Sequence, residues 1–409
     1  MIDLHDRYRG ALVGCGIGDA MGSPVEGWPA ERIRHVYGRL ESYIAQPDGS
    51  LTPRLTDDTQ MTLCLAGSIV EYGHLDPEDL ARRFDAWLYV GRGVGRATRE
   101  AIMRYRAGLP WDEAGVPSSG NGAAMRAAPL GLLHPADLNA LRRDARLASM
   151  ITHNDSLATA SAAAVGADVG YLTTCPAGTA TCEGFLDALL QALEGLDDLP
   201  YPLSHLGRSM SLSQRLDQVG QVLDASPEEA FAVTHNGGFV LESLPAAVWS
   251  FLAHIEDPAE AIRTAVNGGF DADTVAAMTG AFAGAYHGAS GFPNEWVWPL
   301  EFADGLAGWA DQMVALVGRA NPMKAGLRCS TSDSTHGWKP ISIDGRFFPT
   351  VEHAFRSLTA KDPVDQERIR VAPTPVDAEL AARAVVPDID AWSKRDDLMT
   401  DLMNRGKKD

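Results

Sequence analysis

Alanine-rich segments with apolar residues every three to four positions recur through the first three quarters of the chain. Spacing of this kind predicts amphipathic helices rather than strands. The predicted helices cover residues 4–21, 57–72, 77–90, 99–106, 138–151, 156–171, 183–193, 209–223, 227–234, 240–255, 258–266, 274–287 and 306–317. Residues 198–205 contain two prolines and are expected to form a surface loop. The sequence therefore predicts a mainly α fold.

The character of the chain changes after about residue 319. Asn321-Pro322 breaks the last predicted helix. Residues 339–349 predict two short strands around an Asp344-Gly345 turn, and a helix is expected over 350–358. A chain of 409 residues is long for one compact core. We therefore expect an all-helical domain at residues 1–318 and a small α+β segment at 319–409.

Composition narrows the class of protein. Apolar residues make up 45% of the chain and charged residues 22%, which is typical of a soluble globular protein. The polar start does not resemble a signal peptide, and no run reaches the roughly 18 apolar residues of a membrane span. Five cysteines, an odd number without a C-x-x-C pair, favour reduced thiols in a cytoplasmic protein.

The formal net charge of the chain is -19. A field of that sign disfavours non-specific binding to nucleic acid, so no stable nucleic-acid complex is expected. It still permits a small anionic ligand, because bound cations and helix N-termini can offset negative charge locally. Simple solubility is an equally good interpretation of the acidity.

Two predicted helices begin with paired acids. Thr56-Asp57-Asp58-Thr59 precedes one apolar helix, and Asp271-Ala272-Asp273-Thr274 precedes another. Each motif alone is most simply a helix cap, since acids favour helix N-termini. If the two helix starts meet, their oxygens form the ligand set that magnesium and manganese prefer. Carboxylates crowded in this way repel one another unless divalent cations neutralise them.

Other motifs lie around these two starts. A glycine-rich stretch from Gly14 leads to Glu26, either an exposed loop acid or a functional one. The loop at residues 120–126 leaves backbone N–H groups accessible, as a pyrophosphate site needs, although most such loops are turns. His153 could hydrogen-bond a phosphate or ribose, or act only as a cap.

The order of these motifs is specific. G-D-A-M-G-x-P-x-E, T-D-D-T-x-M, G-N-G-A-A-M-R, T-H-N-D and G-G-x-D-A-D-T follow one another over roughly residues 5–318, which resembles the ADP-ribosylglycohydrolase family. The resemblance implies an all-helical fold with two divalent metals, Mg²⁺ or sometimes Mn²⁺. It implies Thr56, Asp57, Asp58, Asp271, Asp273 and Thr274 as metal ligands, with Asp58 and Asp273 also catalytic. It further implies Glu26 as the catalytic loop acid, and Gly120, Asn121, Gly122, Ala123, Ala124, His153 and Asn154 as substrate-binding residues.

The implied activity is removal of ADP-ribose from a modified macromolecule by hydrolysis at the ribose anomeric carbon. We expect the metals to hold the ribose hydroxyls and polarise a water, with an oxocarbenium-like transition state. One feature departs from the arginine-specific members, which carry an aspartate in a D-I-G-x-T stretch. The corresponding run begins at Gly93 and contains no acid, which puts an ADP-ribosyl-arginine substrate in doubt.

The C-terminal segment has a second resemblance. The stretch from Ile343 to Phe355, with the later Trp392, is similar to the NADAR domain, an N-glycosidase fold that acts on ADP-ribose-related compounds. The resemblance implies Glu352 as a catalytic residue and Trp392 as part of a substrate site. The later part of that family's pattern is missing, so a non-catalytic appendage is an open alternative.

Two other functions remain open from the sequence. The tail could act on ADP-ribosylated guanine in nucleic acid, which would make the target a nucleic acid instead of a protein. Alternatively, the chain could bind ADP-ribose without cleaving any bond. No membrane partner is expected.

Overall fold

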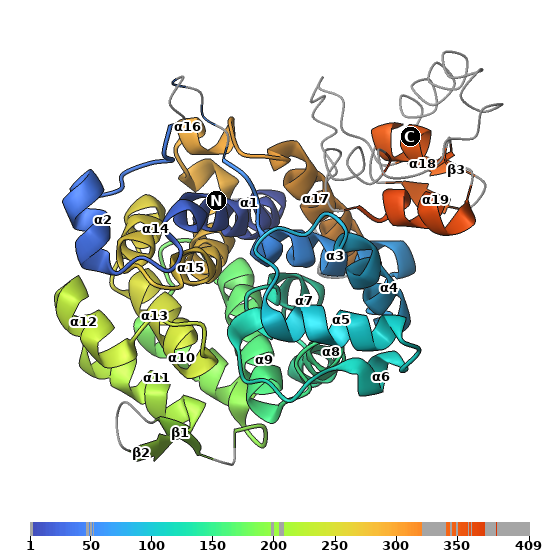
Figure 1. Ribbon diagram of the computed structural model, residues 1–409. Helices are drawn as coiled ribbons and strands as arrows, with labels where there is room; N and C mark the ends of the chain where they lie inside the picture. The colour runs from blue at the N-terminus through green and yellow to red at the C-terminus, as the bar shows by residue number, and fades with distance from the viewer. Residues whose placement is uncertain are drawn as a thin grey trace.

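The computed structural model describes residues 3–45, 49, 51, 53–197, 200–203, 208–320, 341–343, 346–348, 351–358, 360, 362–372 and 382. Helices dominate the described residues, which confirms the predicted mainly α fold (Figure 1). The longer helices are α1 (Leu4–Gly22), α2 (Ala30–Tyr37), α3 (Asp57–Tyr72), α4 (Pro77–Trp87), α5 (Arg96–Arg106), α8 (Leu138–Met150), α9 (Ser156–Thr174), α10 (Cys182–Leu193), α11 (Leu212–Gln221), α12 (Pro227–Thr234), α13 (Val240–Leu252), α14 (Pro258–Asn267), α15 (Ala272–His287) and α17 (Ala303–Ala320). Shorter helices are α6 (Trp111–Ala114), α7 (Ala128–Leu133) and α16 (Asn294–Val297), with 3₁₀ turns at Ser23–Val25, Asn121–Ala123 and Ala289–Gly291.

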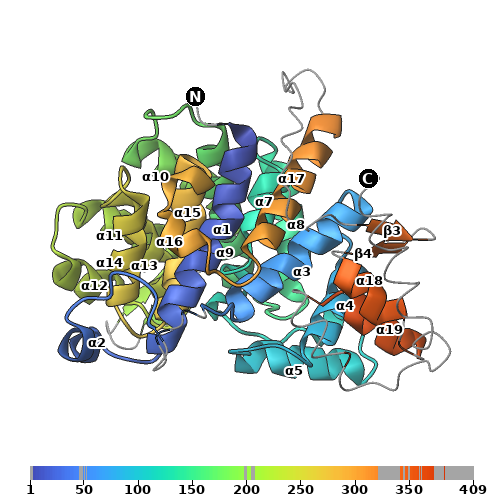
Figure 2. The same cartoon turned by 90° about the horizontal axis from the view of Figure 1, so that it is seen from above.

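Helices α1 and α15 pack against each other at the centre of the fold (Figures 1 and 2). Their glycines lie at the contact: a Cβ atom on Gly14 would fall 2.1 Å from the carbonyl oxygen of Gly280. Gly10 faces Gly284 and Gly22 faces Ala272, so the two helices are antiparallel. Only residues without a side chain allow backbones to approach this closely. The arrangement places the C-terminal end of α1 beside the first turn of α15.

Most helices follow the sequence prediction, and some segments differ. Helices α3 and α12 have the predicted bounds, whereas α2 and the short helices were not predicted. The loop expected at residues 198–205 is partly wrong, because β1 (Tyr201–Leu203) pairs with β2 (Arg208–Met210) in an antiparallel ribbon. The helix predicted from residue 209 begins at Leu212 instead, where Ser211 forms a capping box with Gln214. The Tyr201 hydroxyl reaches the side chains of Asp155 and Ser156, a tertiary contact that local pattern does not reveal.

The C-terminal segment contains the predicted pair of strands, β3 (Ile341–Ile343) and β4 (Arg346–Phe348), in antiparallel register. Helices α18 (Val351–Leu358) and α19 (Pro363–Arg370) follow. Seen from above, α19 lies beside α4 (Figure 2). The buried Arg370 forms an ion pair of 2.8 Å with Glu71 at the end of α3.

Among the residues that the structure describes, no helix has both the length and the apolar character needed to cross a bilayer. Among the described residues, Cys15, Cys64, Cys175 and Cys182 form no disulfide bonds.

Candidate active site

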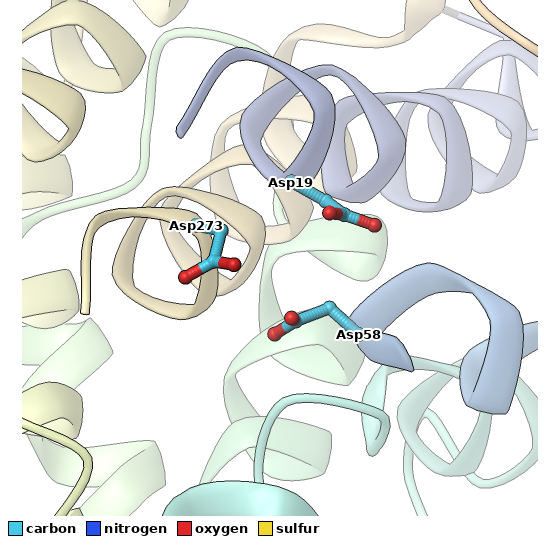
Figure 3. A group of neighbouring side chains, drawn as sticks. All are labelled: Asp19, Asp58 and Asp273. Carbon is cyan, nitrogen blue, oxygen red and sulfur yellow. The ribbon is translucent and has the colours of Figure 1, made fainter. Parts of the chain in front are cut away.

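The two acidic helix starts lie next to each other in the fold. Asp58 in the first turn of α3 and Asp273 in the first turn of α15 face Asp19, near the end of α1 (Figure 3). Each contributes a carboxylate oxygen, and these oxygens all lie within 4.8 Å of one another. The three side chains are almost completely buried. The convergence follows from the antiparallel packing of α1 on α15.

A second group of acids shares Asp273 with the first. Carboxylate oxygens of Glu26, Asp271 and Asp273 also lie within 4.8 Å of one another. Glu26 is exposed on the loop after α1. This loop is tied to the start of α15, because Gly27 N–H donates to the Phe270 carbonyl at 2.6 Å and Phe270 N–H donates to the Trp28 carbonyl at 2.6 Å.

Neither of these two helix starts has a side-chain cap bond. Thr56 and Asp271 occupy the N-cap positions of α3 and α15, but neither side chain accepts a cap hydrogen bond. Elsewhere in the same fold, Asp76 and Asp155 do cap their helices. A side chain at an N-cap position without its bond is free for another role.

Asp19 is a site residue that the sequence analysis did not single out. Its carboxylate accepts hydrogen bonds from the Thr56 and Thr59 hydroxyls, each at 2.6 Å, and from both backbone N–H groups. These bonds fix the start of α3 against α1. An acid among glycines and apolar residues of a buried helix was the available signal, since such an acid needs a partner.

Burial and mutual repulsion raise the pKa values of these acids. Burial, then the nearby Asp19, raises the pKa of Asp57 to about 8. Burial and the neighbouring acids raise the pKa values of Asp58 and Asp273 well above the ordinary range for a carboxyl group. Burial raises the pKa of Glu26 as well, with smaller effects of Asp271 and Asp19. The ionised form of acids clustered in this way is favourable only when a positive charge binds among them.

The oxygens present fit a divalent cation. Asp58 Oδ1 is buried and has no hydrogen-bond partner among the described residues. The Thr56 hydroxyl donates its proton to Asp19 Oδ1, which leaves its oxygen lone pairs free. Thr274 is buried beside Asp273, with its N–H 3.0 Å from Asp273 Oδ1. Carboxylate and hydroxyl oxygens are the ligands that Mg²⁺ and Mn²⁺ prefer, so the residues at this place suit a hard divalent cation.

A cavity of about 270 Å³ opens onto the acidic cluster. Its lining includes Glu26, Asp57, Asp58, Asp271, Asp273 and Thr274 together with Gly120, Asn121, Gly122 and His153. Three residues expected at the substrate do not line it. Ala123 and Ala124 are buried within the core, and Asn154 is exposed.

Asn121 connects the glycine loop to the acids. Its amide group donates to Asp271 Oδ2 and, at 3.1 Å, to the Ser243 hydroxyl. Both donors of Asn121 are therefore used within the protein. This places Asn121 as a support of Asp271, a role that the loop motif alone did not suggest.

His153 is buried and uncharged at neutral pH. Burial, followed by the nearby Arg126, lowers its pKa to about 3. Its Nδ1 atom lies 2.9 Å from the Thr152 hydroxyl. A Cβ atom on Gly122 would fall 2.5 Å from the ring, so the glycine loop packs directly on the imidazole.

Gly93 stands where arginine-specific members carry the aspartate of their D-I-G-x-T stretch, and its surroundings favour a glycine. Gly93 has a φ of +73°, a conformation that residues with a side chain rarely adopt. A Cβ atom there would lie 2.8 Å from Asp57 Oδ1. An aspartate is therefore disfavoured at this position in this chain, by backbone conformation and by charge.

Neither of the two candidate residues of the C-terminal segment, Glu352 and Trp392, is among the described residues that line this cavity. Glu352 lies in α18, which packs on α19. Trp392 lies outside the described residues.

Comparison with known proteins agrees with this geometry. The family model of the ADP-ribosylglycohydrolases matches residues 1–322. An uncharacterised protein of Archaeoglobus fulgidus is 33% identical, covering 74% of this chain and 95% of its own. The ADP-ribosylarginine hydrolase Tri1 of Pseudomonas putida is 31% identical, with 71% of this chain and 73% of the relative covered. The ADP-ribosylhydrolase ARH3 of Danio rerio is also 31% identical, with 74% and 88% covered.

A solved structure described as an ADP-ribosylglycohydrolase-related protein complex superposes with a TM-score of 0.61 at 30% identity. The match covers 77% of this chain and 99% of the other. The chain belongs to the ADP-ribosylglycohydrolase family and is a hydrolase of glycosidic bonds.

Proposed function

We propose that this protein is a metal-dependent hydrolase that removes ADP-ribose from a modified protein by cleaving the glycosidic bond at the ribose anomeric carbon. One observation carries the proposal: acids at the starts of α3 and α15 line one cavity, beside the buried Asp19 of α1, and neither helix start makes a side-chain cap bond. The names of the relatives from P. putida and D. rerio support ADP-ribose as the group removed.

Two divalent cations, Mg²⁺ or Mn²⁺, are the proposed cofactors. Asp273 belongs to both groups of acids, which supports two neighbouring cations that share this carboxylate. The proposed ligands are Thr56, Asp57, Asp58, Asp271, Asp273 and Thr274. Asp19 is the proposed support of Thr56, because both of its oxygens already accept hydrogen bonds. When bound, such cations would hold the ribose hydroxyls and lower the pKa of a water.

The protein's own groups complete the reaction. Water adds to the anomeric carbon while the bond to the modified residue breaks, and the proton that water loses goes to the departing group. Glu26 is the exposed carboxylate of the cluster, and we propose that it positions this water. The surrounding carboxylates stabilise the positive charge that develops on the ribose ring.

The linkage that is cleaved is part of the proposal. Arginine-specific members carry an aspartate where this chain has Gly93, and the left-handed backbone there disfavours a side chain. This supports a linkage other than ADP-ribosyl-arginine. The relative from P. putida is named an ADP-ribosylarginine hydrolase, so an arginine conjugate belongs in the test beside serine and guanine conjugates.

The test is hydrolysis of these conjugates by the purified full chain with Mg²⁺, with Mn²⁺ and with excess EDTA. We expect activity with a metal and none with EDTA. Asp58→Ala and Asp273→Ala should each lose more than the roughly 10- to 100-fold typical of residues that only support a ligand. Asp6→Ala, at a partly exposed acid in the first turn of α1, serves as the control. Full activity in EDTA or in both site variants would overturn the metal-dependent mechanism.

A further inference from the structure

Only one side chain that lines the cavity at the acidic cluster carries a permanent positive charge. Its five carboxylate side chains belong to Glu26, Asp57, Asp58, Asp271 and Asp273. Among the lining residues, all of which the structure describes, Arg96 is the only lysine or arginine. His153 adds no positive charge at neutral pH. Arg96 is therefore the side chain of this cavity that attracts a negatively charged part of a ligand.

The side chain of Arg96 is not engaged with any other described residue. Its side chain is exposed, and no hydrogen bond or ion pair of the described residues involves it. Other arginines nearby are held: Arg92 pairs with Glu301 at 2.7 Å, and Arg104 donates to the Gly115 carbonyl at 3.1 Å. An unpaired guanidinium at the mouth of an acidic cavity is available to a ligand.

The position of Arg96 is fixed relative to the acids. It is the first residue of α5, and the N-cap residue Gly95 donates its N–H to Asp57 Oδ2 at 3.3 Å. Gly93 lies against the same carboxylate. The segment that leads into α5 is thus attached to the acidic cluster, and Arg96 follows it directly.

We propose that Arg96 binds the diphosphate of ADP-ribose. In this arrangement the diphosphate lies between the start of α5 and the Gly120–Gly122 loop. This inference rests on the proposed function, because it takes ADP-ribose as the ligand. A guanidinium can donate two parallel hydrogen bonds to a phosphate, in a geometry that an ammonium group does not match. The positive charge also offsets the repulsion between the diphosphate and the five carboxylates of the cavity.

The test is calorimetric titration of the full chain with ADP-ribose in the presence of Mg²⁺. We expect Arg96→Gln to weaken binding about tenfold, and Arg96→Lys to weaken it less, because lysine keeps the charge but not the paired donors. Arg99→Gln is the matched control: Arg99 is exposed in the same helix, has no partner in the described structure and does not line the cavity. It should bind within about twofold of the wild type, as expected of a surface change away from the site.

Salt and kinetics separate a phosphate contact from a structural effect. Wild-type affinity should fall as salt rises from about 50 to 300 mM, and the affinity of Arg96→Gln should fall less. With a cleavable conjugate, Arg96→Gln should raise KM more than it lowers kcat. If wild type binds ADP-ribose and Arg96→Gln binds it equally well, this inference is wrong and the proposed function stands. If wild type binds no ADP-ribose, the proposed function fails and this inference fails with it.

Discussion

The Thr56 hydroxyl donates a hydrogen bond of 2.6 Å to the buried carboxylate of Asp19, and this bond joins the start of α3 to the end of α1. Thr56 occupies an N-cap position without capping its helix. The bond holds the threonine oxygen beside Asp58 of α3, whose Oδ2 atom lies 3.2 Å away. Asp19, which is not one of the predicted metal ligands, thus positions Thr56, which is one of them.

Asp19→Asn should weaken metal binding by about 10- to 100-fold, the usual cost of removing a group that orients a ligand. The amide nitrogen cannot accept the bonds that Asp19 Oδ2 receives from the Thr59 N–H and hydroxyl. Calorimetric titration with Mn²⁺ and Mg²⁺ measures the effect. Asp6→Asn is the control on the same helix, because among the described residues the Asp6 side chain hydrogen-bonds to Ser290, away from the acidic cluster. Wild-type affinity in Asp19→Asn would contradict the supporting role.

Without metal, the protein should lose stability as pH rises from about 5 to 8. Burial and Asp19 raise the pKa of Asp57 to about 8, against an unfolded value near 3.9. Between these values the folded state binds more protons than the unfolded state, so the free energy of unfolding falls as pH rises.

Thermal unfolding in EDTA across this pH range measures the effect. Added Mg²⁺ should raise the melting temperature more at pH 8 than at pH 5, because cations bind carboxylates. Asp57→Asn should reduce the slope of stability against pH in EDTA. A metal-free protein that becomes more stable between pH 5 and 8 would refute this interpretation of the cluster.

Gly14→Ala should destabilise the fold by more than about 1–3 kcal/mol, the usual cost of overpacking a core. The new Cβ atom would lie 2.1 Å from the Gly280 carbonyl oxygen and would push α1 away from α15. Activity should fall along with stability, because the acids of the two helices would separate. Gly220→Ala in α11, where nothing lies within 4 Å of the new atom, should be neutral or stabilising. Urea unfolding measures the free energy of unfolding of both variants, and an unchanged value in Gly14→Ala would contradict the prediction.

Gly93→Asp should not create an enzyme for ADP-ribosyl-arginine. Its backbone φ of +73° would strain a side chain, by about 1–3 kcal/mol, and the new carboxylate would approach Asp57. We expect weaker metal binding and lower activity on every conjugate. Gly220→Ala in α11, away from the cavity and with open space around its Cβ position, should retain both. A gain of arginine-directed activity in Gly93→Asp would show that conformation does not exclude the acid.

The sequence also predicted several features that the structure bears out. Apolar spacing and the residues at helix ends were sufficient for α3 and α12, because these signals are local. Two short strands around Asp344-Gly345 were predicted for the same reason. The ribbon at Tyr201 was missed, since the Tyr201 hydroxyl bonds to the distant Asp155. The start of α11 was placed three residues too early, although the local capping box of Ser211 and Gln214 marks it.

For the site, the sequence determined which residues could carry the chemistry: paired acids at helix starts, a glycine loop and a histidine, in one order. It left open whether each acid was only a cap. The tertiary structure decided this, because glycines bring α1 against α15 so closely that Asp19, Asp58 and Asp273 share one buried space. Helix starts are set by neighbouring residues, whereas the distance between carboxylates more than 200 residues apart is set only by how the helices pack.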